Sequence, residues 1–565
     1  MKRLLGLMFS AQALLLALLL TLCLPAQAVS DFNLKAKKGN PGAPAEYSWD
    51  SAGKVLTVKD GAYITITGAA TDGTRIEVAA SAKATITLDD VSMSGLGAGS
   101  STSRRLIRYK DGLKGGLHIQ HKEDPNMDIG LGANQSPLAL GPGARVKLNL
   151  RGSNTLTAGD CTLTKPGYCA GIEVPGGAML DIDGAGALTA MGGSGFGVAV
   201  GNSGYCGGGG RGGRCVSGGG GTVIISGGAV TANCSDANSH GGGGGGIYSG
   251  GGTIIINGGT VTACDIYGGE NGTITISGGV VTAKHGIKSG DGGVITISGG
   301  EVTANGGIGG YIGSGPWSVD KDLTVTISGG TVTSTGNSTD AGIGGSIYGT
   351  NGTIIIDITG DANVTAQGGD GNTLGGGSGG GAGIGGNGSS YGGEVGTIKI
   401  DTTGTVKATG GKGFQGGSAG ANIGQGGRVI ISSSEASTGA GIKSVSGPTP
   451  ASASVAVGGT VSFTCDVTAM PNTPVPNFAL SLQFSSRAAA PKEWAPTTVT
   501  EGGASAVFTL PNVTPGMAGQ YRCVVLATDF PRGGRHKDDA DKKGNAPASS
   551  IRYVSSAATL TVTPN

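Results

Sequence analysis

Three carboxylates within one stretch of the chain have the chemistry and the spacing of a calcium site. Asp181 and Asp183 alternate with apolar residues along a short strand, so their side chains are expected on one face. Glu173 lies a few residues before them. Calcium favours several carboxylate oxygens, which makes Glu173, Asp181 and Asp183 our candidate calcium ligands. The alternative, that the two aspartates are solvated residues at the edge of a turn, stays open.

A second candidate site is the most charged stretch of the chain, residues 104–128. Its basic side chains could bind an acidic glycan, or they could belong to a solvated insertion. Residues three apart on a strand point to opposite sides, so we do not expect the two histidines to share a metal ion. The candidate glycan ligands are Arg104, Arg105, Arg108, Lys110, Lys114, His118 and His121.

No set of residues in the sequence predicts catalysis. Cleavage of a polysaccharide needs clustered carboxylates with a basic residue, or an acid and a base at a set separation. Asp89 and Asp90 are adjacent and would face opposite sides of a strand. The basic run at residues 284–288 has no pair of aspartates before it, and no Gly-rich string ends in the Gly-Lys-Ser/Thr of a phosphate-binding loop. We therefore expect a non-catalytic protein.

The composition excludes further classes of protein. Glycine accounts for 118 of 565 residues, which is incompatible with a mainly helical chain. The formal net charge is +1, so no overall attraction to nucleic acid or acidic membranes is expected. A charged start, an apolar run and Ala26-Gln27-Ala28 predict a signal peptide, residues 1–28, cleaved after Ala28. No later segment is apolar enough to span a membrane, so we expect a secreted or bacterial cell-surface protein, with the periplasm as the alternative.

Cysteine usage supports export. The signal peptide contains Cys23, and an even number of cysteines remains, which in an exported chain predicts disulfides. Eight cysteines allow 105 pairings, so the sequence alone leaves the connectivity open. The pairs Cys161/Cys169 and Cys206/Cys215 would close short loops, and we favour a bond between Cys234 and Cys264.

A repeat determines the predicted fold. Thr273-Ile-Thr-Ile-Ser-Gly-Gly-Val-Val-Thr-Ala283 returns almost unchanged at 222–232, 253–263, 294–304 and 324–334. Each unit alternates, turns at glycine and alternates again, which predicts a strand, a turn and a strand. The Ile before the turn recurs in steps of 31, 20, 21, 30 and 31 residues, from Ile225 to Ile358. Steps of this size suit the coils of a parallel β-solenoid, with the longer coils carrying Gly-rich loops.

Stacking explains why such coils would form. Successive coils would place Ile on Ile and Val on Val in interior columns, and no coil could bury its apolar face alone. Cys234 and Cys264 follow equivalent valines on successive coils, hence the cross-coil disulfide. Thr-x-Thr pairs such as Thr260/Thr262 suggest an ice-binding surface, but Val280/Thr282 and Glu301/Thr303 interrupt the pairs. We do not expect an ice-binding protein.

A different domain follows a Ser/Gly/Pro-rich segment. Cys465, Tyr521 and Cys523 form a Cys…Tyr-x-Cys pattern, and the chain ends in an alternating strand. This pattern resembles an immunoglobulin-like domain, whose tyrosine corner would be Tyr521. The Trp expected between the cysteines is replaced by Leu482. Another β-sandwich with one disulfide is the alternative. The predicted boundaries are 29–435 for the solenoid, 436–452 for a linker and 453–565 for the second domain.

The first domain also resembles a known family. The strings from Tyr63-Ile-Thr-Ile-Thr through Ile86-Thr-Leu-Asp-Asp-Val-Ser92, then Ala170-Gly-Ile-Glu-Val-Pro175 and the Ser-Gly-Gly coils, are similar to secreted bacterial carbohydrate-binding β-helix proteins. The resemblance implies a right-handed parallel β-helix of the pectate-lyase-like superfamily. It also implies binding of plant-type polysaccharides, sometimes with calcium. We therefore expect an all-β chain that binds a polysaccharide as an adhesin. A structural stalk and a polysaccharide lyase or hydrolase are the alternatives.

Overall fold

The computed structural model describes most of the two predicted domains, and structural statements below concern its described residues alone. The predicted signal peptide, the basic stretch at 104–128 and Cys161 lie outside them. The described residues are 30–40, 45–94, 136–159, 169–193, 197–202, 205–206, 215–216, 220–234, 246–310, 322–345, 353–371, 379–386, 394–414, 419–424, 428–431, 436–437, 442–469, 478–485, 495–501, 505–527 and 551–564.

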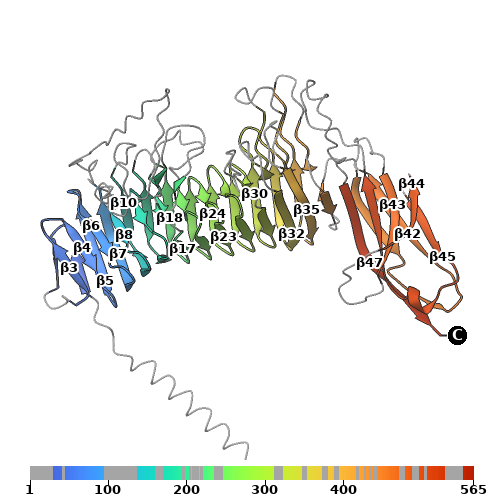
Figure 1. Cartoon of the computed structure of the whole chain (residues 1–565), viewed down its shortest axis with the longest axis horizontal. Coiled ribbons are helices and arrows are strands. Elements are labelled where there is room, and N and C mark those ends of the chain that lie inside the picture. Colours follow the sequence, from blue (N-terminus) through green and yellow to red (C-terminus); the bar gives the residue numbers. More distant parts are fainter. Residues whose placement is uncertain are drawn as a thin grey trace, which may run out of the picture.

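The first domain is a parallel β-helix whose coils have three strands each (Figure 1). Strands of successive coils stack in parallel and form three columns. Column one contains β5 (Tyr63–Ala70), β7 (Lys83–Met93), β9 (Arg145–Arg151), β12 (Met179–Gly184), β17 (Thr222–Ile225), β20 (Thr253–Ile256), β23 (Thr273–Ile276), β26 (Val294–Ile297), β29 (Leu323–Ile327), β32 (Thr353–Gly360), β35 (Glu394–Thr402) and β38 (Arg428–Ile431).

Column two begins at the end of β7, and column three contains short strands that the repeat did not predict. Column two contains β10 (Ser153–Thr157), β13 (Ala187–Met191), β18 (Ala229–Asn233), β21 (Thr260–Ala263), β24 (Val280–Ala283), β27 (Glu301–Ala304), β30 (Thr331–Thr335), β33 (Asn363–Gln367), β36 (Val406–Thr409) and β39 (Ala436–Ser437). Column three contains β4 (Val55–Val58), β6 (Arg75–Val78), β8 (Leu138–Leu140), β11 (Ile172–Glu173), β14 (Val200–Gly201), β19 (Ile247–Tyr248), β22 (Ile266–Tyr267), β25 (Ile287–Ser289), β28 (Ile308–Gly310), β31 (Ile343–Gly345), β34 (Ile384–Gly385) and β37 (Ile423–Gly424).

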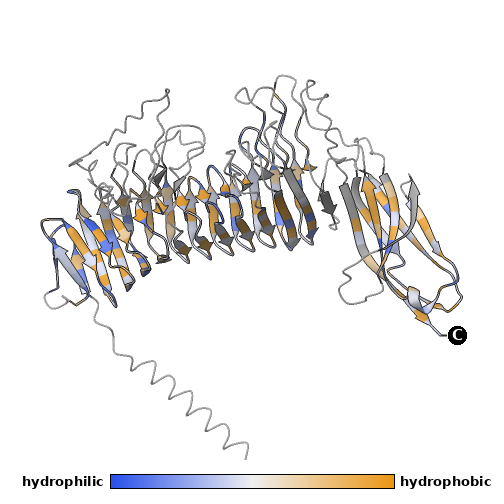
Figure 2. Ribbon diagram, in the orientation of Figure 1, coloured by the Kyte–Doolittle hydropathy of each residue, from blue (hydrophilic) through white to orange (hydrophobic). Residues whose placement is uncertain are grey.

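Stacked aliphatic side chains fill the interior of the solenoid. Ile256, Ile276 and Ile297 are fully buried and align from coil to coil, as the repeat predicts. Val261 and Val281 form the neighbouring stack. Figure 2 shows hydrophobic residues recurring at equivalent places on neighbouring strands. Each aliphatic side chain is covered by the coils on either side, so the core is continuous along the solenoid.

Glycine is required at the turn between columns one and two. At Gly279 the backbone has φ +80°, and an added Cβ would lie 2.7 Å from the carbonyl oxygen of Gly259 on the preceding coil. An L side chain would therefore meet both a strained backbone and a close contact. The Ser-Gly-Gly motif thus permits the close stacking of successive turns.

An antiparallel cap closes the N-terminal end of the β-helix. Strand β1 (Ser30–Asn33) pairs in parallel with β5 and antiparallel with β2 (Lys38–Gly39). Strand β3 (Tyr47–Asp50) pairs antiparallel with β4 and forms the edge of column three. Phe32 contacts Tyr47 and Trp49, with ring centroids 5.6 and 5.5 Å apart. These rings pack against the first interior layer, which no preceding coil covers within the described residues.

The second domain is a β-sandwich held by a disulfide between its sheets. One sheet contains β40 (Ile442–Thr449), β42 (Val461–Ala469) and β45 (Ser505–Leu510). The other contains β41 (Ser452–Ala456), β43 (Phe478–Ser485), β44 (Ala495–Glu501), β46 (Gly519–Ala527) and β47 (Ile551–Thr563), and a 3₁₀ turn, η2 (Pro515–Met517), precedes β46. Cys465 and Cys523 are bonded. The Tyr521 hydroxyl donates to the carbonyl oxygen of Met517 at 2.8 Å, which confirms the tyrosine corner.

Two features of the sandwich refine the sequence predictions. Leu482 is fully buried in the place where a Trp is expected. Most of the segment predicted as a linker, residues 436–452, is strand: β40 pairs with β42 and belongs to the sandwich. The Ser, Gly and Pro residues of this segment suggested a linker, but Ile442–Thr449 forms a strand because β42 supplies a partner.

Candidate functional site

The structure separates the predicted calcium ligands. Glu173 lies on β11 in column three and is 2% exposed, whereas Asp181 and Asp183 lie on β12 in column one. A corner at residues 174–178 turns the chain from one column to the other, so the prediction of a three-carboxylate site is wrong. Within the described part of the chain, no group of three or more His, Cys, Asp or Glu side chains could hold a metal ion.

Asp181 and Asp183 do share the outer face of β12, as predicted, but each has a protein partner. Ser226 on the next coil donates its hydroxyl to Asp181 Oδ1 at 2.8 Å. The backbone N–H of Gly184 donates to Asp183 Oδ1, and Lys147 Nζ lies 3.3 Å from Asp183 Oδ2. The hydrogen bond from Gly184 and the Lys147 ammonium lower the pKa of Asp183. Both carboxylates thus connect neighbouring coils.

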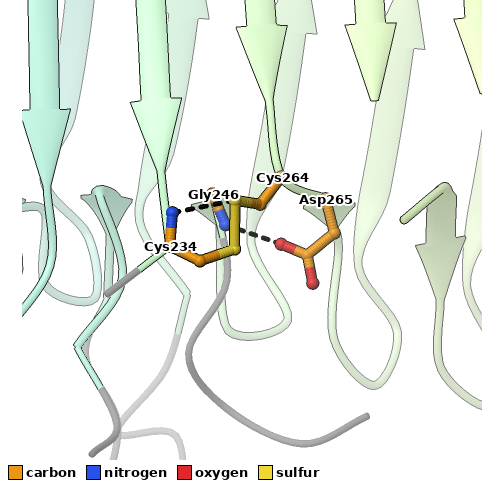
Figure 3. Close-up of a disulfide and its surroundings, with 4 residues drawn as sticks. All are labelled: Cys234, Gly246, Cys264 and Asp265. Atoms are coloured by element: carbon orange, nitrogen blue, oxygen red, sulfur yellow. Dashed lines mark hydrogen bonds between the residues drawn. A yellow bond between two sulfur atoms is a disulfide. The ribbon is translucent and has the colours of Figure 1, made fainter. Parts of the chain in front are cut away.

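The predicted cross-coil disulfide is present (Figure 3). Cys234 follows β18 and Cys264 follows β21, with their Cα atoms 5.9 Å apart. The next residue, Asp265, accepts a hydrogen bond from the backbone N–H of Gly246 at 2.6 Å. Burial raises the pKa of the Asp265 carboxyl, and the Gly246 hydrogen bond opposes this shift. Cys264 and Asp265 therefore attach both Cys234 and Gly246, from the preceding coil, to their own coil.

For three of the remaining cysteines the structure gives a bonded state or a backbone position. Cys169 is disulfide-bonded. Cys206 and Cys215 lie opposite each other in the two-stranded antiparallel ladder of β15 (Tyr205–Cys206) and β16 (Cys215–Val216). The backbone thus places Cys206 opposite Cys215, in keeping with the predicted pair. In the sandwich, the disulfide joins Cys465 and Cys523.

A continuous row of threonines runs along the outer face of column two. One Thr from each of eight successive strands aligns with the Thr of the next strand, and all eight are exposed or half-buried. We call this row the threonine ladder. Its members are Thr155, Thr189, Thr231, Thr262, Thr282, Thr303, Thr333 and Thr365.

The sequence comparison of Thr-x-Thr pairs missed this ladder. It treated each pair as a unit, and the first member of the pair does vary, as at Val280 and Glu301. The second member never varies over eight coils. Unequal coil lengths hide this alignment until the register of the strands is known.

The surface beside the threonine ladder is almost uncharged. The neighbouring outer row contains one residue from each of the same eight strands, and Glu301 is its only charged member. These residues are exposed or half-buried, and Val280 is 44% exposed. The row consists of Ser153, Ala187, Ala229, Thr260, Val280, Glu301, Thr331 and Asn363. We call the two rows together the ladder face.

A recess opens at the start of the ladder face. It has a volume of about 710 Å³, and Ser153, Ala187 and Ala229 of the neighbouring row line it. Asn149 and Arg151, at the end of β9 just before the turn between columns one and two, also line it. The recess and the threonine ladder thus form one continuous surface, with hydroxyls along its length and a guanidinium at one end.

Column three has a different outer surface. Tyr248 and Tyr267 stack with ring centroids 5.4 Å apart, and Lys288 follows them in the same row. Lys288 pairs with Asp340 Oδ2 at 3.2 Å, passing Gly309, the next member of the row. Burial, helped by Glu270, raises the pKa of Tyr248 to about 12. These contacts satisfy the Lys288 ammonium and cover much of the two rings, so we regard this row as structural.

Comparison with known proteins identifies the second domain. Residues 451–533 match the family model described as "Immunoglobulin domain". These residues form an immunoglobulin domain. No curated protein matches the chain, and 21 chains of solved structures do. One of these comes from a structure described as "Structural basis of T cell specificity and activation by the bacterial superantigen toxic shock syndrome toxin-1", with 13% identity, 21% of this chain and 97% of that chain covered, and a TM-score of 0.15. A likeness of this size carries no argument about function.

Proposed function

We propose that the protein is an extracellular, non-catalytic polysaccharide-binding protein of the adhesin type, and that the ladder face of its β-helix binds the glycan. The unbroken threonine ladder is the observation that carries this proposal. A hydroxyl group donates and accepts hydrogen bonds, as the hydroxyls of a sugar do. Seven steps of about 4.8 Å make the row about 34 Å long, which suits an extended polymer that lies along the solenoid.

The character of the ladder face favours a glycan over other polymers. An almost uncharged surface offers little to nucleic acid, whose binding depends on neutralising phosphates. The aliphatic parts of Val280, Ala187 and Ala229 could contact the apolar faces of sugar rings while the threonines bind the hydroxyls. Arg151 in the recess would suit an acidic sugar at one end of the bound segment.

An extracellular location is part of the proposal. Two disulfides lie within the described residues of the two domains, and such bonds persist in oxidising compartments. Among the residues that the structure describes, no helix has the length and apolar composition needed to cross a membrane. Secretion by the predicted signal peptide and a place on a bacterial surface remain proposals.

Retention of the full-length chain on polysaccharides tests the proposed function. The wild type is tested for retention on insoluble neutral polysaccharides and on acidic polysaccharides, each with and without a calcium chelator. We expect retention on at least one of them. Retention on none would contradict the proposal and favour a structural stalk. New reducing or unsaturated ends in the same samples would instead indicate a hydrolase or a lyase.

Paired variants locate the site. The double substitution Thr262→Arg with Thr303→Arg places two long charged side chains on the ladder face, two coils apart. Its matched control, Thr275→Arg with Thr326→Arg, makes the same change on the outer face of column one. We expect at least a tenfold loss of retention for the first variant and wild-type retention for the control. Equal retention of both would show that the glycan binds elsewhere.

A further inference from the structure

The last strand of the immunoglobulin domain joins both domains. Strand β47 pairs with β46 along most of its length. On its other edge it pairs in parallel with β41 at Thr559–Thr563 and, near its start, with β38, the last strand of column one. The aligned residues at this junction are Val429 with Ile551, Ile430 with Arg552, and Ile431 with Tyr553. Column one of the solenoid therefore continues into the sandwich as one sheet.

Each domain would have an open strand edge without this junction. In the sandwich, β41 occupies the edge of β47 only at its end, and Ile551–Tyr553 lie beyond its reach. In the solenoid, β38 pairs with β35 on one edge and has β47 on the other. An open edge presents unpaired N–H and C=O groups that can pair with another chain. The junction removes both edges at once.

The opposite end of column one is closed by a different device. There β1 pairs with the short antiparallel β2, and Lys35, Lys37 and Lys38 lie at this hairpin, exposed or half-buried. Lysines and very short strands are common ways to prevent an edge from pairing. Strand β38 begins with the charged Arg428, but its next three residues, Val429, Ile430 and Ile431, are an uncharged aliphatic run. Among the described residues, β47 is the strand that occupies this edge.

We propose that the immunoglobulin domain is the C-terminal cap of the β-helix, and that its β47 keeps β38 from pairing with β38 of a second copy of this chain. If the β47 pairing is lost, two identical β38 edges meet antiparallel. Pairing of the same surface on both copies closes the assembly at a dimer. This inference concerns the junction between the domains and does not depend on glycan binding.

Two adjacent proline substitutions in the full chain test the cap. In a parallel ladder, successive residues of a strand direct their N–H and C=O groups to opposite edges. Of Ile551→Pro and Arg552→Pro in β47, one therefore removes an N–H from the β38 side and the other from the β46 side, and both leave the β38 edge itself intact. Hydrogen exchange of Val429–Ile431 identifies the first, because exchange of these amides rises at least tenfold in that variant. The other variant is the matched control.

The molar mass in solution, measured by light scattering after gel filtration, decides the proposal. We expect the wild type and the control to be monomeric and the junction variant to form a dimer at micromolar concentration. A junction variant that stays monomeric would overturn the proposal. A second measurement needs no variant: in the wild type, the amides of Ile551–Tyr553 that face away from β46 must be protected. Exchange of these amides at the rate of an unstructured chain would also overturn it.

Discussion

Removal of the cross-coil disulfide is expected to loosen two coils of the solenoid and leave the rest of the chain intact. The double substitution Cys234→Ser with Cys264→Ser opens a loop with a sequence separation of 30 residues. The loop-closure relation assigns such a bond about 3.6 kcal/mol of stabilisation, chiefly by restricting the unfolded chain. In a solenoid each coil contacts only its neighbours, so this loss should remain local.

Hydrogen exchange followed by mass spectrometry measures this effect strand by strand. A loss of about 3.6 kcal/mol corresponds to an increase of roughly 400-fold in the opening equilibrium of the affected coils. We expect this increase in peptides that contain β18 and β21, and wild-type exchange in β43 and β46. A change below about tenfold in β18 and β21 would refute the reasoning, because the coils would then be held by stacking alone.

The second disulfide provides the matched control. Cys465 and Cys523 are 58 residues apart, for which the same relation predicts about 4.2 kcal/mol. Their replacement by Ser should raise exchange in β42 and β46 and leave β18 and β21 unchanged. Uniform changes over both domains in either variant would contradict the local character that we assign to each bond.

Two further predictions concern the solenoid core and its buried acid. Ile276→Ala should destabilise the protein by about 2–5 kcal/mol, measured by chemical denaturation. The fully buried Ile276 side chain contacts the coils on both sides, so its truncation leaves a cavity that cannot close. Thr275→Ala on the outer face is the control. Burial raises the folded pKa of Asp265 above 3.8, so its contribution to stability should fall as the pH rises from 3.8 through the raised value. Asp265→Asn keeps an acceptor for Gly246 and should flatten the stability profile in this range, whereas an unchanged profile would show that Asp265 does not titrate differently on folding.

Much of the fold could be predicted from the sequence because two signals were local and repeated. Alternation identified the strands of columns one and two, and the recurring sequence spacing of Ile and Val, as in Ile276 and Val281, located the turn between them. Equal positions on successive coils then predicted the pairing of Cys234 with Cys264. The same reasoning found Cys465, Cys523 and Tyr521 in the sandwich.

The missed features depend on non-local geometry. Most strands of column three have two or three residues, such as Ile266–Tyr267, which are too short to show a period. The grouping of Glu173 with Asp181 failed because the chain turns a corner between them, from column three to column one. Sequence spacing alone does not show where such a corner lies. Of the candidate site, the sequence located neither the threonine ladder nor the recess, since both arise from register between coils of unequal length. Strand β40 could be assigned only once its partner β42, which is distant in the sequence, was known.

The shortest coils of the solenoid have a consequence for how such a protein can change size. From Ile256 to Ile276 and from Ile276 to Ile297, one full coil is 20 or 21 residues long and contains a complete interior layer, one Asn-Gly-Gly or Ser-Gly-Gly turn and one threonine of the ladder. An in-frame duplication of such a coil would add no new type of contact, since its faces match those of its neighbours. Gene duplication can thus change the length of the solenoid in steps of one coil and leave both of its ends unchanged.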